Sequence, residues 1–176
     1  MTPLPRGTRC NKRRIDPSEP EQGITMIETR HLFDIALTVP SIVDLGQTPL
    51  GGRKIATVTG GEFSGERLRG TVHPSVGGDW LLMRGDGVLT LDVRLTLQTD
   101  DGALIHMRYQ GLRHGPEDIM AKVNRGEAVP AGSYYFRVTP TFETAAPAYA
   151  WLNGLLAVGT GERTAQGPRY QVYEIC

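Results

Sequence analysis

The sequence predicts an all-β protein with about nine or ten antiparallel strands and one short helix. From Ile27 onwards, hydrophobic residues mostly alternate with polar ones, which is the period of a half-buried strand. The 22 glycines and 12 prolines suit many short strands that are joined by tight turns. Closure into a single antiparallel β-barrel would remove the exposed sheet edges, although alternation alone does not separate a barrel from a sandwich.

The expected elements follow one another with short connections. A loop over 46–52 around Pro49 and a break at Gly60-Gly61 separate the early strands. Later, Pro116 fits the first turn of a short helix, the acids that follow suit its positive end, and Gly126 fits its stop. The predicted strands cover 29–39, 53–59, 68–73, 80–84, 88–99, 103–111, 134–139, 155–160 and 170–175, with a further segment at 142–144, a helix over 116–125 and one helical turn over 148–153.

The longest strand pair is a hairpin whose register is set by its turn. The loop Asp100-Asp101-Gly102, with its glycine in the left-handed conformation, pairs Thr99 with Ala103. A slip of one residue would mix the two faces, and the register also places Arg94 opposite Arg108. One face then holds Leu91, Val93, Leu95, Leu97, Ile105, Met107 and Tyr109, and the other holds Asp92, Arg94, Thr96, Gln98, Leu104, His106, Arg108 and Gln110.

Composition and charge bound the location and the partners. The 176 residues fit one domain, and the balance of 19 basic against 19 acidic residues predicts neither nucleic-acid nor membrane binding. Residues 1–25 are polar, lack an apolar stretch and are expected to be a disordered extension of a domain that covers 26–176. Cys10 and Cys176 provide neither a disulfide framework nor a metal-binding spacing, so a cytoplasmic location is expected.

Short blocks also occur in a fixed order along the chain. They are Gly52-Arg53, Gly60-Gly61-Glu62-Phe63-Ser64-Gly65, Leu68-Arg69-Gly70, Asp79-Trp80, Asp86-Gly87, Leu91-Asp92-Val93-Arg94, Thr99-Asp100-Asp101-Gly102-Ala103, Tyr135-Phe136-Arg137, Phe142-Glu143-Thr144 and Tyr149-Ala150-Trp151-Leu152-Asn153. In order and spacing, the chain from Met26 resembles the DUF3237 proteins, also called UPF0311. The resemblance implies a single antiparallel β-barrel of roughly lipocalin-like shape that self-associates, and it implies little about chemistry. Glu66 and Val138 depart from the family pattern, without affecting a charged position.

The polar face of the hairpin is the first candidate site. In one interpretation it lines the barrel, where Arg94, His106 and Arg108 would bind an anionic ligand and Asp92 would orient an arginine or act as a base. In the other interpretation the face is solvated, and Asp92 merely offsets the facing arginines.

A second candidate cluster comes from the C-terminal third of the chain. Trp151 would form the wall of a ligand site, Asn153 would hydrogen-bond the ligand, and Arg137 would contribute a charge. Glu143, if buried, would serve as an acid or base. The alternative is a structural corner, in which Trp151 closes one end of the barrel and Asn153 caps loop backbone.

The leading hypothesis is a barrel that binds a small anionic organic molecule. Within it, a cofactor-free enzyme of isomerase, lyase or hydrolase type would use Asp92 or Glu143 for proton transfer, with an arginine stabilising negative charge. The four histidines are too scattered for a metal motif, and no nucleotide-binding motif is present, so neither a metal nor a cofactor is expected. The alternative is a non-catalytic barrel that assembles as a homo-oligomer.

Trp80, which follows a glycine-rich turn, is expected to pack in the core.

Overall fold

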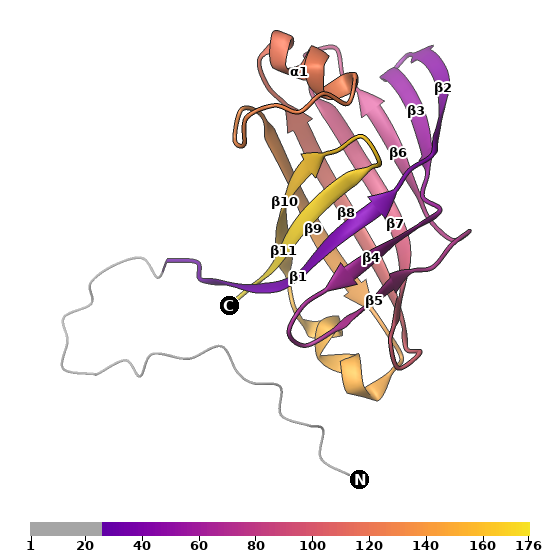
Figure 1. Cartoon of the computed structure of the whole chain (residues 1–176), viewed down its shortest axis with the longest axis vertical. Helices are drawn as coiled ribbons and strands as arrows, with labels where there is room; N and C mark the ends of the chain where they lie inside the picture. The colour runs from indigo at the N-terminus through magenta and orange to yellow at the C-terminus, as the bar shows by residue number, and fades with distance from the viewer. Residues whose placement is uncertain (1–25) are drawn as a thin grey trace, which may run out of the picture.

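The computed structural model describes residues 26–176, which form one antiparallel β-barrel (Figure 1). The predicted extension over 1–25, which includes Cys10, lies outside the described residues. The elements are β1 (Thr29–Thr38), β2 (Ser41–Thr48), β3 (Gly51–Thr57), β4 (Gly60–Ser64), β5 (Arg69–Val72), β6 (Gly78–Met83), β7 (Leu89–Thr99), β8 (Leu104–His114), α1 (Glu117–Asn124), β9 (Tyr135–Glu143), the 3-10 helix η1 (Pro147–Gly154), β10 (Ala157–Arg163) and β11 (Pro168–Ile175).

The barrel closes through the strand order β7-β5-β4-β1-β11-β10-β9-β8, because β8 pairs back onto β7. These eight strands confirm the predicted fold class. The remaining strands, β6, β3 and β2, extend from the first half of β7, whereas β5 pairs with its second half. The wall therefore forks at β7, and we call the end that carries α1 and the β2–β3 hairpin the mouth (Figure 1).

The hairpin of β7 and β8 has the predicted register. Arg94 lies opposite Arg108, the Thr99 amide donates to the Ala103 carbonyl oxygen at 3.0 Å, and Gly102 has a φ of 84°. The apolar face of the hairpin points into the barrel and packs against side chains from β1, β9 and β11. This core contains Phe33, Val93, Leu95, Leu97, Ile105, Met107, Phe136 and Val172, each at most 1% exposed.

Two early strands and one later strand differ from the expectation. The predicted loop over 46–52 is largely strand, because β2 and β3 form a hairpin, and β2 is so exposed that it needs no alternating pattern. Gly60 and Gly61 do not break the sheet but begin β4, and a Cβ atom on Gly61 would lie 2.1 Å from the Ala36 carbonyl oxygen. β9 runs through Pro140, which is tolerated because β10 pairs with β9 only at Arg137 and Val138.

An ion-pair cluster closes the barrel at the end opposite the mouth. Glu174 of β11 is 5% exposed and pairs with Arg30 of β1 and with Arg67, whose Nη2 lies 2.7 Å from its carboxylate. The Arg67 guanidinium also lies 4.1 Å from the ring centroid of Trp151 in η1. The cluster therefore ties β1, β11, the β4–β5 connection and η1 together.

Among residues 26–176, no helix is long and apolar enough to cross a bilayer. The cytoplasmic location, the domain boundary at Met26 and the absence of nucleic-acid partners stay predictions from the sequence.

Candidate functional site

The polar face of the β7–β8 hairpin lies outside the barrel. Asp92 is about one third exposed and Arg94 and Arg108 about one half, and Asp92 carboxylate oxygens lie 3.4 Å from Arg94 Nη2 and 3.7 Å from Arg108 Nε. Asp92 thus offsets the repulsion between the facing arginines, as the second interpretation predicted. His106 points to the same outer face. A lumenal placement of these four residues is wrong, because the alternate side chains of both strands fill the interior.

The second predicted cluster is not brought together either. Arg137 lies on the outer face of β9 beside Tyr135, at 5.1 Å from its ring centroid, and Glu143 is exposed at the far end of that strand. Asn153 accepts a hydrogen bond from the Thr144 amide at 2.8 Å and donates to its carbonyl oxygen at 2.9 Å. The corner interpretation therefore describes the structural contacts of Asn153 and of Trp151, which packs against the core.

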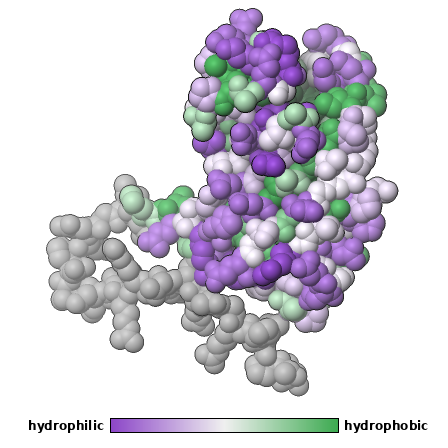
Figure 2. Space-filling view, in the orientation of Figure 1, coloured by the Kyte–Doolittle hydropathy of each residue, from purple (hydrophilic) through white to green (hydrophobic). Residues whose placement is uncertain are grey.

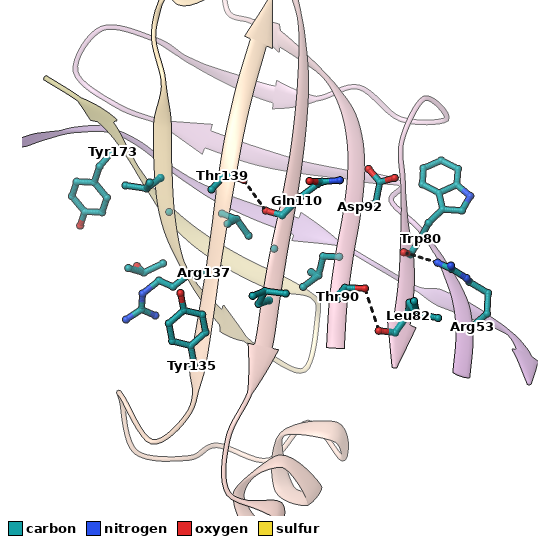
Figure 3. A pocket seen from close by; sticks show the side chains of 17 residues that line it. Arg53, Trp80, Leu82, Thr90, Asp92, Gln110, Tyr135, Arg137, Thr139 and Tyr173 are labelled. Carbon is teal, nitrogen blue, oxygen red and sulfur yellow. Dashed lines mark hydrogen bonds between the residues drawn. The ribbon is translucent and has the colours of Figure 1, made fainter. Parts of the chain in front are cut away.

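A shallow groove of about 840 Å³ runs across the outside of the sheet (Figure 3). Trp80, Arg53 and Asp92 lie on one side of it, and Tyr135, Arg137 and Tyr173 lie on the other. Trp80, Leu112 and Tyr135 are 38%, 40% and 43% exposed in the groove, so the expectation of Trp80 as a core residue was wrong. The Arg94 guanidinium lies 5.3 Å from the Trp80 ring centroid, which is a contact of two outer side chains.

The cavity with buried polar groups lies in the mouth, between the lobe of α1 and the β2–β3 hairpin. Figure 2 shows this hollow at the top of the molecule, with hydrophobic atoms in its depth. Its volume is about 260 Å³, just below the range of about 300–1,000 Å³ that is typical of ligand pockets. Apolar walls come from Leu37, Val39, Ala56, Leu81, Leu89, Leu91 and Phe136, and the polar residues are Lys54, Asp79, Tyr109, Arg113, Asn124, Arg163 and Tyr170.

Asp79 is the carboxylic acid of this cavity. It lies on β6 between Ala56 of β3 and Val93 of β7, and it shares an inward face with Leu81. It is only 9% exposed, and burial raises its pKa to about 7, although the Asp92 amide donates to its Oδ1 at 3.3 Å. The charge of Arg113 favours the carboxylate, but less than burial disfavours it. Asp79 can therefore both give and accept a proton near neutral pH.

Two buried phenols accompany Asp79. Tyr109 and Tyr170 are each 2% exposed, and their rings pack edge to face with centroids 5.3 Å apart. Burial raises the pKa of both phenols above the ordinary value of 10.0, so both stay protonated. The hydroxyls approach each other, but within residues 26–176 neither has a partner with the geometry of a hydrogen bond. Both hydroxyls thus have hydrogen-bonding capacity that no residue among 26–176 uses.

Removal of either hydroxyl should not destabilise the protein. We expect Tyr109→Phe and Tyr170→Phe to leave the free energy of unfolding unchanged or to raise it by up to about 1 kcal/mol, because an unpartnered buried hydroxyl is unfavourable. Tyr134→Phe is the matched control, since the Tyr134 hydroxyl accepts a hydrogen bond from the Arg163 amide at 2.8 Å. That variant should lose about 1 kcal/mol. Urea denaturation compares the three variants, and equal losses in all of them would contradict the expectation.

The cavity was not identified from the sequence, although part of its signal is present there. Tyr109 falls on the apolar face of the hairpin, and Arg113 falls on the same face beyond the end of the predicted strand over 103–111. Asp79 and Leu81 share the inner face of β6. A carboxylate at such a core position is the feature of the sequence that indicates the cavity. Its association with Tyr170 depends on the fork at β7, which no local pattern reveals.

Within residues 26–176, no group of three or more His, Cys, Asp or Glu side chains is arranged to hold a metal ion.

Comparison with known proteins places the chain in a family. The family model "Protein of unknown function (DUF3237)" matches residues 27–175. A UPF0311 protein of Rhodopseudomonas palustris is 34% identical over 149 residues, which is 85% of this chain and 97% of that protein. A crystal structure of a conserved protein of unknown function from the same species has a TM-score of 0.81 at 33% identity, over 87% of this chain and 100% of that one. The hydroalkoxylation enzyme of Penicillium herquei is 31% identical over 130 residues, covering 73% of this chain and 70% of the enzyme. The protein described here therefore belongs to the DUF3237, or UPF0311, family.

Proposed function

We propose that the protein is a cofactor-free acid–base enzyme, which binds a small organic molecule in the mouth of the barrel and uses Asp79 for proton transfer. One observation carries the proposal: a buried carboxyl group with a pKa of about 7 faces a cavity that also holds unpartnered polar atoms. Proton transfer was predicted for Asp92 or Glu143. Asp92 is paired with two arginines on the outer face and Glu143 is exposed on β9, so neither faces the cavity, and Asp79 takes this role in the proposal.

The chemistry follows from the groups around the cavity. As a carboxylate, Asp79 accepts a proton from a substrate hydroxyl, and as an acid it returns a proton to carbon. The Tyr109 hydroxyl and the nearby guanidinium groups would stabilise an oxyanion that forms between these steps. The relative from Penicillium herquei is named for hydroalkoxylation, the addition of an O–H group across a C=C bond. Such an addition needs only a proton relay when it occurs within one molecule.

A suitable probe is ortho-hydroxyphenyl vinyl ketone, which isomerises to chromanone. In this reaction the phenol oxygen bonds to the terminal alkene carbon, the C=C π bond breaks to give an enolate, and the phenol proton ends on the carbon next to the carbonyl group. Asp79 would carry that proton. We expect the wild-type chain to accelerate cyclisation above the buffer rate, with Asp79→Asn inactive and Asp92→Asn active. Equal rates for wild type and Asp79→Asn, or no acceleration at all, would contradict the proposal.

We also propose that a second copy of the chain covers the outer groove. This proposal agrees with the homo-oligomer that the sequence predicted. Leu112 and Tyr135 are 40% and 43% exposed there, and the groove carries Asp92 near one side and Arg137 near the other (Figure 3). A two-fold axis through the middle of the groove would bring each carboxylate to the arginine of the other copy. This arrangement would place the exposed apolar side chains of the groove at the centre of the interface and the Asp92–Arg137 contacts at its edges.

Light scattering after gel filtration tests this assembly. We expect a dimer for the wild type and a monomer for Leu112→Glu. Leu104→Glu is the matched control, because Leu104 is a 53% exposed leucine on the same strand and outside the groove. A monomeric wild type, or equal effects of the two substitutions, would contradict the proposal.

A further inference from the structure

The mouth cavity contains two arginines that have no acidic partner among the described residues. Arg113 projects from β8 and Arg163 from β10, on either side of β9, and both line the cavity. No ion pair within residues 26–176 includes either of them. The Arg113 guanidinium donates to Asn124 of α1, a neutral side chain, at 3.1 Å. Both arginines are partly buried, and charges that are withdrawn from water in this way are normally paired.

Both guanidinium groups also have unused donors. Arg113 Nε and Arg163 Nη1 are buried and have no hydrogen-bond partner in the described part of the chain. The two groups are close enough for their charges to interact: the pKa of Arg113 is lowered first by burial and next by the charge of Arg163. Two like charges therefore face the same space with donors to spare, which is the arrangement of an anion site.

The acids near the cavity do not neutralise this pair. Among residues 26–176, Asp79 is the one carboxyl group that lines the cavity, and its raised pKa of about 7 leaves it only partly charged near neutral pH. Lys54 adds a third cation to the lining and is itself paired with Asp44 outside, at 3.0 Å. The cavity thus keeps an excess of positive charge.

The walls indicate what carries the anionic group. Phe136 lies on β9, between the strands that carry the two arginines, and the Arg113 guanidinium lies 5.8 Å from its ring centroid. Gly161 of β10 leaves room for that ring, because a Cβ atom there would lie 2.7 Å from it. Leucines from β7 and β6 form the opposite walls. An apolar cavity of about 260 Å³ suits a molecule with a single ring better than a strongly hydrated inorganic ion.

We propose that Arg113 and Arg163 bind the anionic oxygen atoms of an organic monoanion, a carboxylate or phenolate on a ring-sized apolar body, which is the substrate class of the mouth. That the bound anion is a substrate rests on the proposed function, whereas the anion site itself does not require catalysis. It also moves the anion partner from Arg94, which the sequence predicted, to residues on the inner face of the barrel.

Calorimetric titration of the full chain with benzoate tests the site, with benzamide as a neutral probe of the same shape. We expect benzoate to bind and benzamide not to bind. Arg163→Gln should weaken benzoate binding by about tenfold or more, as expected for a lost charged hydrogen bond. Arg94→Gln is the matched control, because it removes the same charge from the outer face and should leave the affinity unchanged.

Thermal unfolding of each variant shows that it is folded before the titration. Binding of benzamide as tight as that of benzoate, no benzoate binding to the folded wild type at millimolar concentration, or an equal loss in Arg94→Gln would each overturn the proposal. Asp79→Asn separates the two proposals: it should retain or improve benzoate binding, because it removes a negative charge from the cavity. Activity that persists in Asp79→Asn would refute the proton-transfer function and leave the anion site intact.

Discussion

Asp79→Asn is expected to remove a large pH dependence of stability. The folded-state pKa of Asp79 is raised by burial from 3.8 to about 7. A shift of roughly three pKa units corresponds to about 4 kcal/mol as an upper bound, because each unit is worth about 1.4 kcal/mol. We therefore expect the variant to be more stable than the wild type by about 2–4 kcal/mol at about pH 8, in the absence of ligand.

The direction of this effect follows from proton binding. Below 3.8, Asp79 is protonated in both the folded and the unfolded chain, and it contributes its full stability. Between 3.8 and about 7, only the folded chain keeps the proton, so stability falls as pH rises. Above about 7 the carboxylate is charged in both states, and the destabilisation is constant. Asparagine is neutral throughout and removes this decline.

Urea denaturation at several pH values between about 4 and 8 measures the difference between wild type and variant. Asp92→Asn is the control, since it makes the same substitution on the outer face of β7, the strand that pairs with β6. It should retain the wild-type decline. A constant difference between wild type and Asp79→Asn across this range would show that Asp79 has an ordinary pKa in the folded chain.

Glu174→Ala is expected to cost about 3 kcal/mol of unfolding free energy. The substitution removes the carboxylate from Arg30 and from Arg67, which is itself stacked on Trp151. The two arginines are partly exposed and can be rehydrated, so the loss should lie at the lower end of the range for buried pairs. Glu143→Ala, at an exposed position of β9, should change stability by less than about 0.5 kcal/mol.

The pH dependence of this cluster has the opposite sign to that of Asp79. Burial alone would raise the pKa of Glu174, but the hydrogen bonds from Arg30 and Arg67 outweigh it and lower the pKa below 4.5. The stabilisation is present above 4.5 and is lost as pH falls through the folded-state pKa. Denaturation at pH 7 with both variants tests the magnitude. A loss in Glu174→Ala no larger than that in Glu143→Ala would contradict the role assigned to the cluster.

The hairpin was the most predictable part of the fold. Its alternation, its three-residue turn and Gly102 fixed which residues share a face and brought Arg94 opposite Arg108. Alternation does not say which face is enclosed, because that depends on strands far away in the sequence. The barrel interior is filled by Val93, Met107 and their neighbours, so the charged face lies outside.

The candidate site was less predictable because it arises from the fork at β7. Asp79 reaches Tyr109 and Tyr170 only because β6 leaves the barrel wall at the mouth, where β11 begins. β2 was missed for a related reason: it lies beyond the barrel, is almost entirely exposed, and has no buried face to impose a pattern. Sequence patterns report local faces, whereas this cavity is made by distant pairings.

Titration of the Asp79 carboxyl carbon by ¹³C NMR tests the central claim most directly, with Asp79→Asn used to assign the signal. We predict that this carbon titrates with a pKa of about 7, against the ordinary value of 3.8. A titration near 3.8 would show that Asp79 is a charged carboxylate at neutral pH, and it would contradict the proton-transfer function proposed for the mouth of the barrel.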